Sequence, residues 1–441
     1  MNKQILRLAL PSIITNVSVP LLSSVDTALV GHLESPAYLG GVAIGAMIFN
    51  FIFWGFGFLR MGTTGLTAQA FGEQRRDECS LILIRSLLVA LAGGLFLILL
   101  QWPIRLIALG QVNASAEVEA QTLVYYNLRI WSAPAVLILY AVQGWFLGMQ
   151  NARYPMILAI VVNCLTIGLD IFFLQALGMK VAGVALGTLI AQYCGVALAL
   201  ILLIVNYRGY LVRFTRARIL ELAAIRRFFG VNRDIFLRTL LLIVTYSFFT
   251  ATSAEYGDTV LAANSILLQL WMILAYGVDG FAYAAESLTG RFIGARDKPN
   301  LHLAVRYIFV WGMSLGVAMS LLYGLFGNSI LHLFTSDEAV IATALAFYAW
   351  TIAAPIVNAA CFVWDGVFIG ATATFPMLIS MAIATVVFFF PIYFLTQPAL
   401  GNHALWLAML SYMAIRGITL TVYAPKAVFA QLRVAGTSTQ P

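Results

Sequence analysis

Four aspartates lie within long apolar stretches of this sequence. Asp26, Asp170, Asp279 and Asp365 are each flanked by mainly hydrophobic residues. A carboxylate inside a membrane costs about 2.5–3.5 kcal/mol or more to insert, so it needs a polar environment and usually has a function. These four acids are therefore the first candidates for binding a cation or a substrate.

Asp26, Asp170 and Thr188 lie at matching depths. Each is seven or eight residues from the same end of its predicted helix, which places all three roughly 10–12 Å below one membrane surface. Two carboxylates in one desolvated pocket repel each other, so at least one of them tends to hold a proton. With hydroxyl and carbonyl oxygens beside them, the same groups could equally coordinate a small hard cation such as Na⁺. No other metal site is predicted.

Each aspartate also has a purely structural interpretation, in which it caps a broken helix or pairs with a buried arginine. For Asp26 and Asp170 this is disfavoured, because no Arg or Lys lies at their depth in the apolar stretches that carry these groups. For the other two acids it stays open, with Arg60 and Arg291 as the candidate partners.

Aromatic side chains offer a surface for flat organic cations. They make up 13% of the chain, and a cation binds favourably over an aromatic ring. We therefore predict that Tyr125 and Tyr140 bind substrate together with Asp26, Asp279 and Asp365. The alternative is that both tyrosines face lipid or core, as most aromatic residues here must.

Two prolines precede Asp26 in the same apolar stretch. Pro11 and Pro20 each remove a backbone hydrogen bond and permit a kink in a helix. A kink whose angle depends on the protonation of Asp26 would couple an ion to a moving helix, so both prolines are candidate hinges. The alternative is that they are simply tolerated, because proline is common in membrane helices.

The chain that positions these residues has the composition of a membrane protein. Of its 441 residues, 62% are hydrophobic and only 10% are charged, compared with about 25% charged residues in soluble domains. Its apolar runs of about 20 residues or more can cross a hydrocarbon layer of ~30 Å as helices. We predict an all-α membrane protein with about twelve transmembrane helices near residues 7–33, 39–69, 81–108, 120–148, 155–178, 181–206, 234–255, 260–290, 303–333, 339–370, 375–396 and 402–428.

The two halves of the chain resemble each other at an offset of 222 residues. Residues 67–72 match residues 289–294, and residues 143–148 match residues 365–370. Six helices in each half predict two pseudo-symmetric bundles, the N-lobe and the C-lobe, related by an axis along the membrane normal. Two such bundles enclose a cleft, and a cleft that opens to alternate sides is the physical basis of secondary transport.

Basic residues gather in alternate loops, and this sorting predicts the orientation. By the positive-inside rule, the basic loops and both termini are predicted to be cytoplasmic. We expect the protein to lie in the inner membrane of a bacterial cell. The same sorting explains the net charge of +7 better than nucleic-acid binding does. The predicted organisation is an N-lobe at 1–206, a cytoplasmic basic linker at 207–233, a C-lobe at 234–430 and a cytoplasmic tail at 431–441.

Motifs for enzymatic chemistry are absent from the sequence. There is no phosphate-binding loop, no His-Glu-x-x-His and no Gly-x-Ser-x-Gly. We therefore predict a transporter that is not an enzyme and needs no cofactor, and that runs on H⁺, or alternatively Na⁺, as coupling ion. It is expected to act as a monomer on organic cations and drugs, in contact with membrane lipid and without nucleic acid.

Several segments resemble the DinF branch of the multidrug and toxic compound extrusion (MATE) family, and the resemblance extends from about residue 5 to residue 425. In the first half these segments are 25–33 (VDTALVGHL), 38–43 (YLGGVA) and 60–72 (RMGTTGLTAQAFG). In the second half they are 275–284 (AYGVDGFAYA) and 365–371 (DGVFIGA). The resemblance implies an antiporter that expels amphipathic, often cationic compounds through a V-shaped central cleft between two six-helix lobes, while protons or sodium ions enter.

The resemblance also implies a cation-responsive site in the N-lobe. The family uses an Asp on helix 1, an Asn and an Asp one turn apart on helix 5, and a Thr on helix 6, and Asp26, Asp170 and Thr188 match this pattern. The Asn position is Thr166 here, and Asn163 one turn earlier could take its place. A threonine oxygen preserves proton coupling better than it preserves tight sodium binding.

In the C-lobe the sequence departs from another branch of the family, which binds sodium through acids on helices 7, 8 and 10. Asp365 matches the acid of helix 10. Helix 7 offers only Glu255, at its outer end. A sodium site in this lobe is therefore doubtful.

Two other functions compete with a cation-coupled drug exporter. A flippase or exporter of a lipid-linked or polyisoprenoid precursor would share the fold, but such proteins usually have more helices or a strongly basic cleft, whereas the intramembrane charges here are mostly acidic. A membrane-embedded enzyme is disfavoured because the nucleophile, metal and base constellations are missing.

Overall fold

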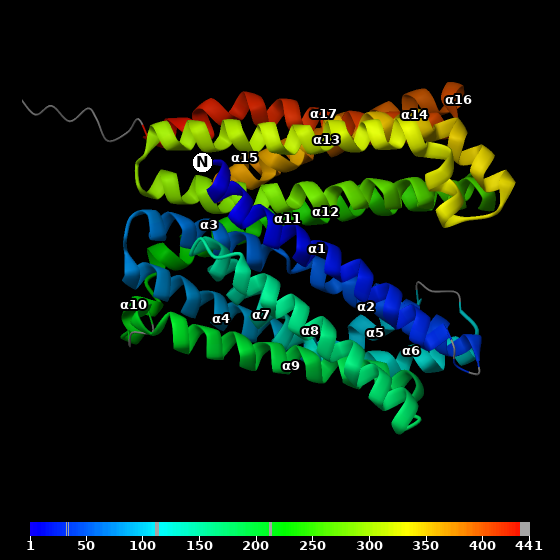
Figure 1. The fold of residues 1–441 in the computed structure, drawn as a ribbon, viewed down its shortest axis with the longest axis horizontal. Helices are drawn as coiled ribbons and strands as arrows, with labels where there is room; N and C mark the ends of the chain where they lie inside the picture. Colours follow the sequence, from blue (N-terminus) through cyan, green and yellow to red (C-terminus); the bar gives the residue numbers. More distant parts are fainter. Residues whose placement is uncertain (32, 34, 111–113, 211–213, 433–441) are drawn as a thin grey trace, which may run out of the picture. The chain divides into compact units, whose positions relative to one another are not determined.

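Nearly the whole of the described chain is helical. The computed structural model describes residues 1–441 except 32, 34, 111–113, 211–213 and 433–441. His32 of the first motif and most of the predicted tail at 431–441 therefore lie outside the described residues. Within the described ranges, twelve helical segments are long and apolar enough to cross a membrane. This confirms the predicted all-α membrane fold (Figure 1).

Contacts divide the chain into two compact units. Ile14–Phe228 forms one, called the N-terminal unit below; Met1–Ile13 together with Phe229–Pro441 forms the other, the C-terminal unit. The lobe boundaries at 206 and 234 stay a prediction, and this division differs from them at two places. The first thirteen residues group with the C-terminal unit, and helix α11 begins at Leu222, inside the predicted linker.

The first helix, α1 (Asn2–Gly31), contributes residues to both units. In its first turns Ile5 and Ala9 are fully buried. Gly280 lies so close to the Ala9 carbonyl and to Ile13 that a Cβ at this position would clash with both. This packing explains why the first thirteen residues belong to the C-terminal unit although they begin the chain.

The N-terminal unit contains several membrane spans made of two consecutive helices. α2 and α3 share one span, α6 and α7 share another, and α8 continues as a π-helix over Phe172–Ala176. α3 and α4 pack on α7, and α8 packs on α9. The helices are α2 (Pro36–Gly55), α3 (Phe58–Gly72), α4 (Arg76–Leu99), α5 (Gln101–Gly110), α6 (Ala116–Arg129), α7 (Ala133–Gly148), α8 (Arg153–Ile171), α9 (Lys180–Asn206) and α10 (Arg216–Ile219).

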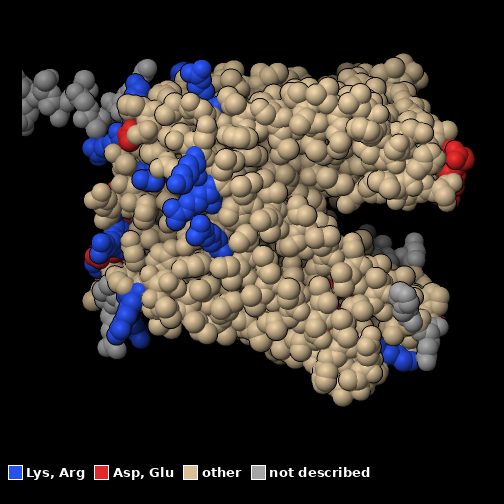
Figure 2. Space-filling view, viewed as in Figure 1, with Lys and Arg blue, Asp and Glu red and all other residues tan. Residues whose placement is uncertain are grey.

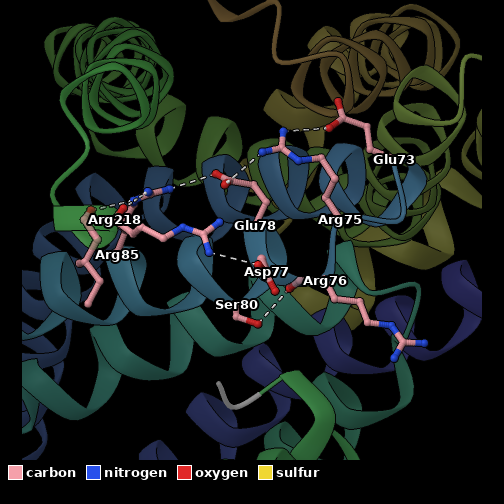
Figure 3. Close-up of polar contacts among 9 residues, drawn as sticks. Glu73, Arg75, Arg76, Asp77, Glu78, Ser80, Arg85 and Arg218 are labelled. Carbon is pink, nitrogen blue, oxygen red and sulfur yellow. Dashed lines mark hydrogen bonds and ion pairs between the residues drawn. The ribbon is translucent and has the colours of Figure 1, made fainter. Parts of the chain in front are cut away.

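The predicted linker contains α10, and α10 is held to α4. Arg85 of α4 is 5% exposed, and its guanidinium donates to the carbonyls of Arg218 and Ile219 at 2.8 and 3.0 Å and to Glu78 at 3.0 Å. Arg218 in turn pairs with Asp77 at 3.2 Å (Figure 3). Arg85 thus satisfies carbonyls that the end of a helix leaves without partners.

The C-terminal unit is built around α14, on which α12, α13 and α17 all pack. α15 is joined to α16 by a π-helical segment, Ile383–Phe389. The helices are α11 (Leu222–Glu255), α12 (Asp258–Gly294), α13 (Lys298–Phe334), α14 (Glu338–Gly370), α15 (Thr374–Ala382), α16 (Phe390–Leu400) and α17 (Asn402–Ala427).

The sequence repeat has a structural counterpart in the packing of glycines. Gly144 of α7 lies against the carbonyl of Arg60 in α3, and Gly366 of α14 lies against the carbonyl of Ala282 in α12. At both glycines a Cβ would clash with the facing backbone. Small residues let helices approach this closely in membranes. Because both partners are displaced by 222 residues, the same helix contact is built once in each unit.

The turns that follow these helices repeat as well. Gln74 and Arg296 have φ of 59° and 55°, and Gln150 and Thr372 have φ of 63° and 53°. Each pair is separated by 222 residues. A non-glycine residue in this left-handed region costs about 1–2 kcal/mol, so its recurrence shows that the turn geometry belongs to the repeat.

Charged side chains are sparse on the visible surface of either unit. Figure 2 shows that, within each unit, the visible surface along the helices is largely uncharged. The exposed side chains of the spans are apolar, for example Leu95, Phe96, Leu321 and Leu395. A surface of this kind is compatible with lipid and not with water.

Candidate functional site

Asp26 and Asp170 come together in the N-terminal unit. Asp26 lies in α1, and Asp170 lies in the last turn of α8, immediately before the π-helical segment. Their carboxyl groups are close enough to couple electrostatically. Asp170 is completely buried and Asp26 is half-buried. π-helical turns are frequent at functional sites, and this one directly follows the buried acid.

The carboxyl oxygens of this pair are poorly satisfied. Both oxygens of Asp170 and Oδ1 of Asp26 are buried without a hydrogen-bond partner in the described part of the chain. An ionised carboxylate in this state is strongly destabilised. Two such groups side by side repel each other, so the pair becomes stable when it holds a positive ion. The arrangement therefore suits an exchangeable proton or small cation.

Gly187 makes room for the Asp170 carboxyl. This residue of α9 lies against Asp170, and a Cβ added to it would overlap Oδ1 and reach the Asp170 amide nitrogen at 3.2 Å. Four residues earlier, Gly183 would bring a Cβ to 2.9 Å from the Cβ of Phe173. The spacing of the two glycines is the signal in the sequence from which this close helix contact can be predicted.

The hydroxyls predicted to share the site bond to their own helices. Thr188 donates to the Val184 carbonyl and Thr166 donates to the Val162 carbonyl, each at 2.9 Å. Both side chains are buried. Only their oxygen lone pairs remain to interact with a cation or a carboxylic acid proton.

Asn163 ties α8 to α1. Its side-chain amide donates to the carbonyl of Ser18 at 3.3 Å. Ser18 itself donates to the carbonyl of Thr15 at 2.7 Å. The structure therefore gives Asn163 a backbone partner on the proline-containing helix, at a point two residues before Pro20.

The two predicted hinges lie inside one continuous helix. α1 runs from Asn2 to Gly31 and includes both Pro11 and Pro20. Pro11 falls in the part of α1 that packs within the C-terminal unit, and Pro20 falls in the part within the N-terminal unit. Ser24 donates to the Pro20 carbonyl at 2.9 Å. Their role as hinges stays a prediction.

A basic residue that the sequence analysis missed accompanies the aspartates. Arg129, at the end of α6, is 9% exposed and interacts electrostatically with Asp26 and Asp170. Its guanidinium lies 5.7 Å from the Phe49 ring and 5.6 Å from the Phe53 ring. It donates to the hydroxyl of Ser132. No ion pair within 4.0 Å joins Arg129 to either aspartate among the described residues, so it is a neighbouring charge and not a direct partner.

Arg129 escaped prediction because it lies in the fourth membrane span. The prediction that no basic residue lies at this depth concerns only the spans that carry Asp26, Asp170 and Thr188. With one guanidinium beside two carboxylates, the site has a net charge of −1 when both acids are ionised. It becomes neutral when it takes up a single proton.

The predicted substrate tyrosines lie near Arg129. Tyr125 is 5% exposed, packs on Gly45, and has its ring 6.3 Å from that of Phe49. Tyr140 is half-buried. Both hydroxyls interact electrostatically with Arg129. Tyr125 is therefore part of the packed interior of the unit in this structure.

The acids predicted in the C-terminal half have a different environment. Asp365 of α14 is 7% exposed and pairs through Oδ2 with Arg238 of α11 and, at 2.7 Å, with Arg416 of α17. The candidate partners from the sequence were Arg291 and Arg60. The observed partners come from helices distant in the chain, which only packing brings together.

Asp279 is not part of this ion pair. It lies half-buried on α12, near Tyr276, which precedes it by about one turn. The structure thus separates the two acids of this half: Asp365 is bound by two guanidiniums, and Asp279 stands on a neighbouring helix. Their predicted role in substrate binding stays a prediction.

Comparison with known proteins identifies the chain. The MatE family model matches residues 11–172 and 235–395, one segment in each half. The chain is 41% identical to DNA damage-inducible protein F of Escherichia coli (strain K12), over 95% of this chain and 91% of that protein. It is 25% identical to the probable multidrug resistance protein NorM of Photorhabdus laumondii, over 78% of this chain and 76% of that protein.

Solved structures agree with this assignment at the level of the fold. A crystal structure described as MATE in the bent conformation superposes with a TM-score of 0.89, covering 98% of this chain and 96% of that chain at 19% identity. An outward-facing multidrug resistance MATE family transporter superposes with a TM-score of 0.88, covering 97% of this chain and 96% of that chain at 20% identity. The family match and the close bacterial relative confirm the predicted resemblance. The chain belongs to the MATE family, whose members are multi-pass membrane transporters and not enzymes.

Proposed function

We propose that this protein is a proton-coupled efflux antiporter of the bacterial inner membrane, with both termini in the cytoplasm. It exports amphipathic, cationic organic compounds and takes up protons at Asp26 and Asp170. The observation that carries the proposal is the pair of adjacent carboxyl groups, three of whose oxygens are buried without a hydrogen-bond partner outside the pair in the described residues. Such a pair is unstable fully ionised, and protonation relieves both the repulsion and the desolvation.

Two features favour a proton over sodium. Arg129 contributes a positive charge beside the carboxylates. This charge would repel a sodium ion. Gly187 brings the α9 backbone against the Asp170 carboxyl, so little space remains for an ion with several oxygen ligands. Hard cations take six or more oxygen ligands, whereas a proton needs one.

Proton uptake can be linked to helix packing through α1. Asp26 and Pro20 lie on this helix, and Asn163 of α8 holds the Ser18 carbonyl between the two predicted hinges. A charged Asp26 and a neutral Asp26 differ in their interaction with Asp170 and Arg129. A change of protonation therefore changes the energy with which α1 packs on α8, and a proline allows the helix to respond by bending.

The substrate class is supported by relatives. Proteins similar to this chain are named multidrug resistance or multidrug and toxin extrusion proteins. Tyr125, Tyr140 and Asp26 would offer aromatic faces and a negative charge to an organic cation. Release of protons would restore that negative charge, and uptake of protons would remove it, so cation and proton would compete for the site.

The experiment is transport in proteoliposomes under separately imposed gradients. Efflux of a fluorescent organic cation should follow a proton gradient and should not follow a sodium gradient. Asp26→Asn and Asp170→Asn should each reduce the rate to that of empty liposomes, whereas Glu119→Gln, which changes an exposed acid in the same unit, should leave it unchanged. Transport driven only by sodium would refute proton coupling, and full activity of Asp26→Asn would refute the role of the pair.

A further inference from the structure

One face of α14 carries a polar residue at every seventh position. Thr351, Asn358 and Asp365 are 1%, 0% and 7% exposed. Seven residues are about two turns of an α-helix, or about 10.5 Å, so residues at this spacing share a face. This face points into the C-terminal unit, because Asp365 meets α11 and α17 there.

Two residues of this face, Thr351 and Asn358, have polar atoms without a hydrogen-bond partner in the described structure. Thr351 Oγ1 and both polar atoms of the Asn358 amide, Oδ1 and Nδ2, are buried without a hydrogen-bond partner in the described structure. Buried polar groups in proteins are nearly always bonded to protein or to ordered water. Asn358 lies in the middle of a membrane helix, where lipid cannot provide these bonds.

The chemistry of the amide identifies what it binds. Oδ1 requires a donor and Nδ2 requires an acceptor. A metal cation would satisfy only the oxygen, and an anion would satisfy only the nitrogen. Water donates and accepts, so it satisfies both. A cation is disfavoured further because two guanidiniums and one carboxylate share the end of this face at Asp365.

The ion pair at the end of the face also calls for solvation. The Arg416 guanidinium binds one oxygen of Asp365 and, at 3.1 Å, the sulfur of Met413, which is a weak acceptor. The ring of Tyr412 also lies near it, 5.2 Å away. Arg238 donates to the same Asp365 oxygen. Buried charges are costly unless they are well bonded, and water held at Asn358 would add polar partners on the side of α14 that leads to Asp365.

We propose that the C-terminal unit binds ordered water against the polar face of α14. The Asn358 amide holds this water, between Thr351 and the Asp365 ion pair. The ligand is water and not a coupling ion or a drug. The inference concerns the unit that does not contain the Asp26–Asp170 pair, so it stands or falls independently of the proposed function.

Cys361 provides a reporter at this place. It lies on the same face, between Asn358 and Asp365, and is 0% exposed. Hydroxyl radicals formed from bound water by X-ray pulses oxidise thiols next to that water, even inside a protein. Cys79 of the N-terminal unit is 1% exposed and serves as an equally buried control.

The experiment is radiolytic footprinting of the full-length protein in lipid nanodiscs, read by mass spectrometry. Cys361 should be oxidised several-fold faster than Cys79, and Asn358→Leu, which keeps the volume but removes both polar atoms, should lower this rate to that of Cys79. Thr351→Val should lower the Cys361 oxidation rate less. This valine variant is the alternative test if the leucine variant does not fold. Equal rates at Cys361 and Cys79 in the unaltered protein, or an unchanged Cys361 rate in a folded Asn358→Leu variant, would overturn the proposal.

Discussion

The two units of this protein hold buried charge in opposite ways. In the N-terminal unit, Asp26 and Asp170 face each other, and their nearest basic residue, Arg129, bonds to Ser132 and not to them. In the C-terminal unit, the buried acid Asp365 is bound by both Arg238 and Arg416. Acids outnumber bases in the first site, and bases outnumber acids in the second.

This difference separates an exchangeable charge from a permanent one. A carboxylate held by two guanidiniums is already neutralised, and a proton or cation would have to displace an arginine to reach it. A carboxylate beside another carboxylate gains stability from any positive ion that arrives. On this difference the proposed ion exchange is assigned to the N-terminal unit, and Asp365 is expected to contribute to packing.

The largest effect is expected from neutralising the N-terminal pair. Asp26→Asn or Asp170→Asn should abolish the drug resistance that the protein confers on susceptible cells, because the pair can no longer change its charge. Expression should stay normal, since the substitution removes a repulsion and not a bond. Resistance and membrane abundance are measured together, and full resistance at normal abundance would contradict the prediction.

The opposite outcome is expected at the C-terminal ion pair. Asp365→Asn leaves Arg238 and Arg416 buried without a counter-charge, and breaking such a pair usually costs about 3–5 kcal/mol. The protein should unfold at a clearly lower temperature in detergent. Glu338→Gln, which changes an exposed acid on the same helix, should shift the unfolding temperature little. An unchanged unfolding temperature for Asp365→Asn would show that the ion pair is not structural.

A smaller effect is expected from Gly187, where the sterics of the N-terminal site can be tested without touching a charge. Gly187→Ala adds a Cβ that overlaps the Asp170 carboxyl, so transport should be reduced but not abolished while the protein still inserts. Gly168→Ala is the matched control on α8, because a Cβ there meets no atom within 4 Å. Equal transport by both variants would mean that Asp170 does not need its present position.

The smallest change, one of ion preference, is expected from Arg129. Arg129→Leu removes the positive charge beside the two acids, so sodium should begin to drive efflux in proteoliposomes. Arg129→Lys keeps the charge and should keep the response to protons alone. If the leucine variant still ignores sodium, Arg129 does not determine the choice of ion.

The number and order of the membrane helices could be predicted because each requires only a local property. A run of about 20 apolar residues satisfies its backbone within itself and matches the membrane thickness. The repeat was visible for the same reason: the glycines that fit backbone against backbone, Gly144 and Gly366, recur at a fixed offset. The approach of Asp26 and Asp170 followed from their equal depth in two helices of one half.

The partners of the buried charges could not be predicted in this way. Arg60 and Arg291 were the candidate partners predicted for Asp365, yet α11 and α17 supply Arg238 and Arg416. Arg129 was overlooked beside Asp26 for the same reason. A side chain's partner depends on the rotation of each helix about its axis and on which helices are neighbours. Neither can be predicted from the hydrophobicity of a single helix.

The amino-acid sequence by itself determined the membrane fold, the twofold repeat and the presence of costly acids, because these depend on local hydrophobicity and on spacing along one chain. Only the tertiary structure decided which acid is held by arginines and which acids face each other without an ion pair in the described residues. That distinction depends on charges from separate helices meeting within a few ångströms, where the low dielectric of the interior makes a single neighbour decisive.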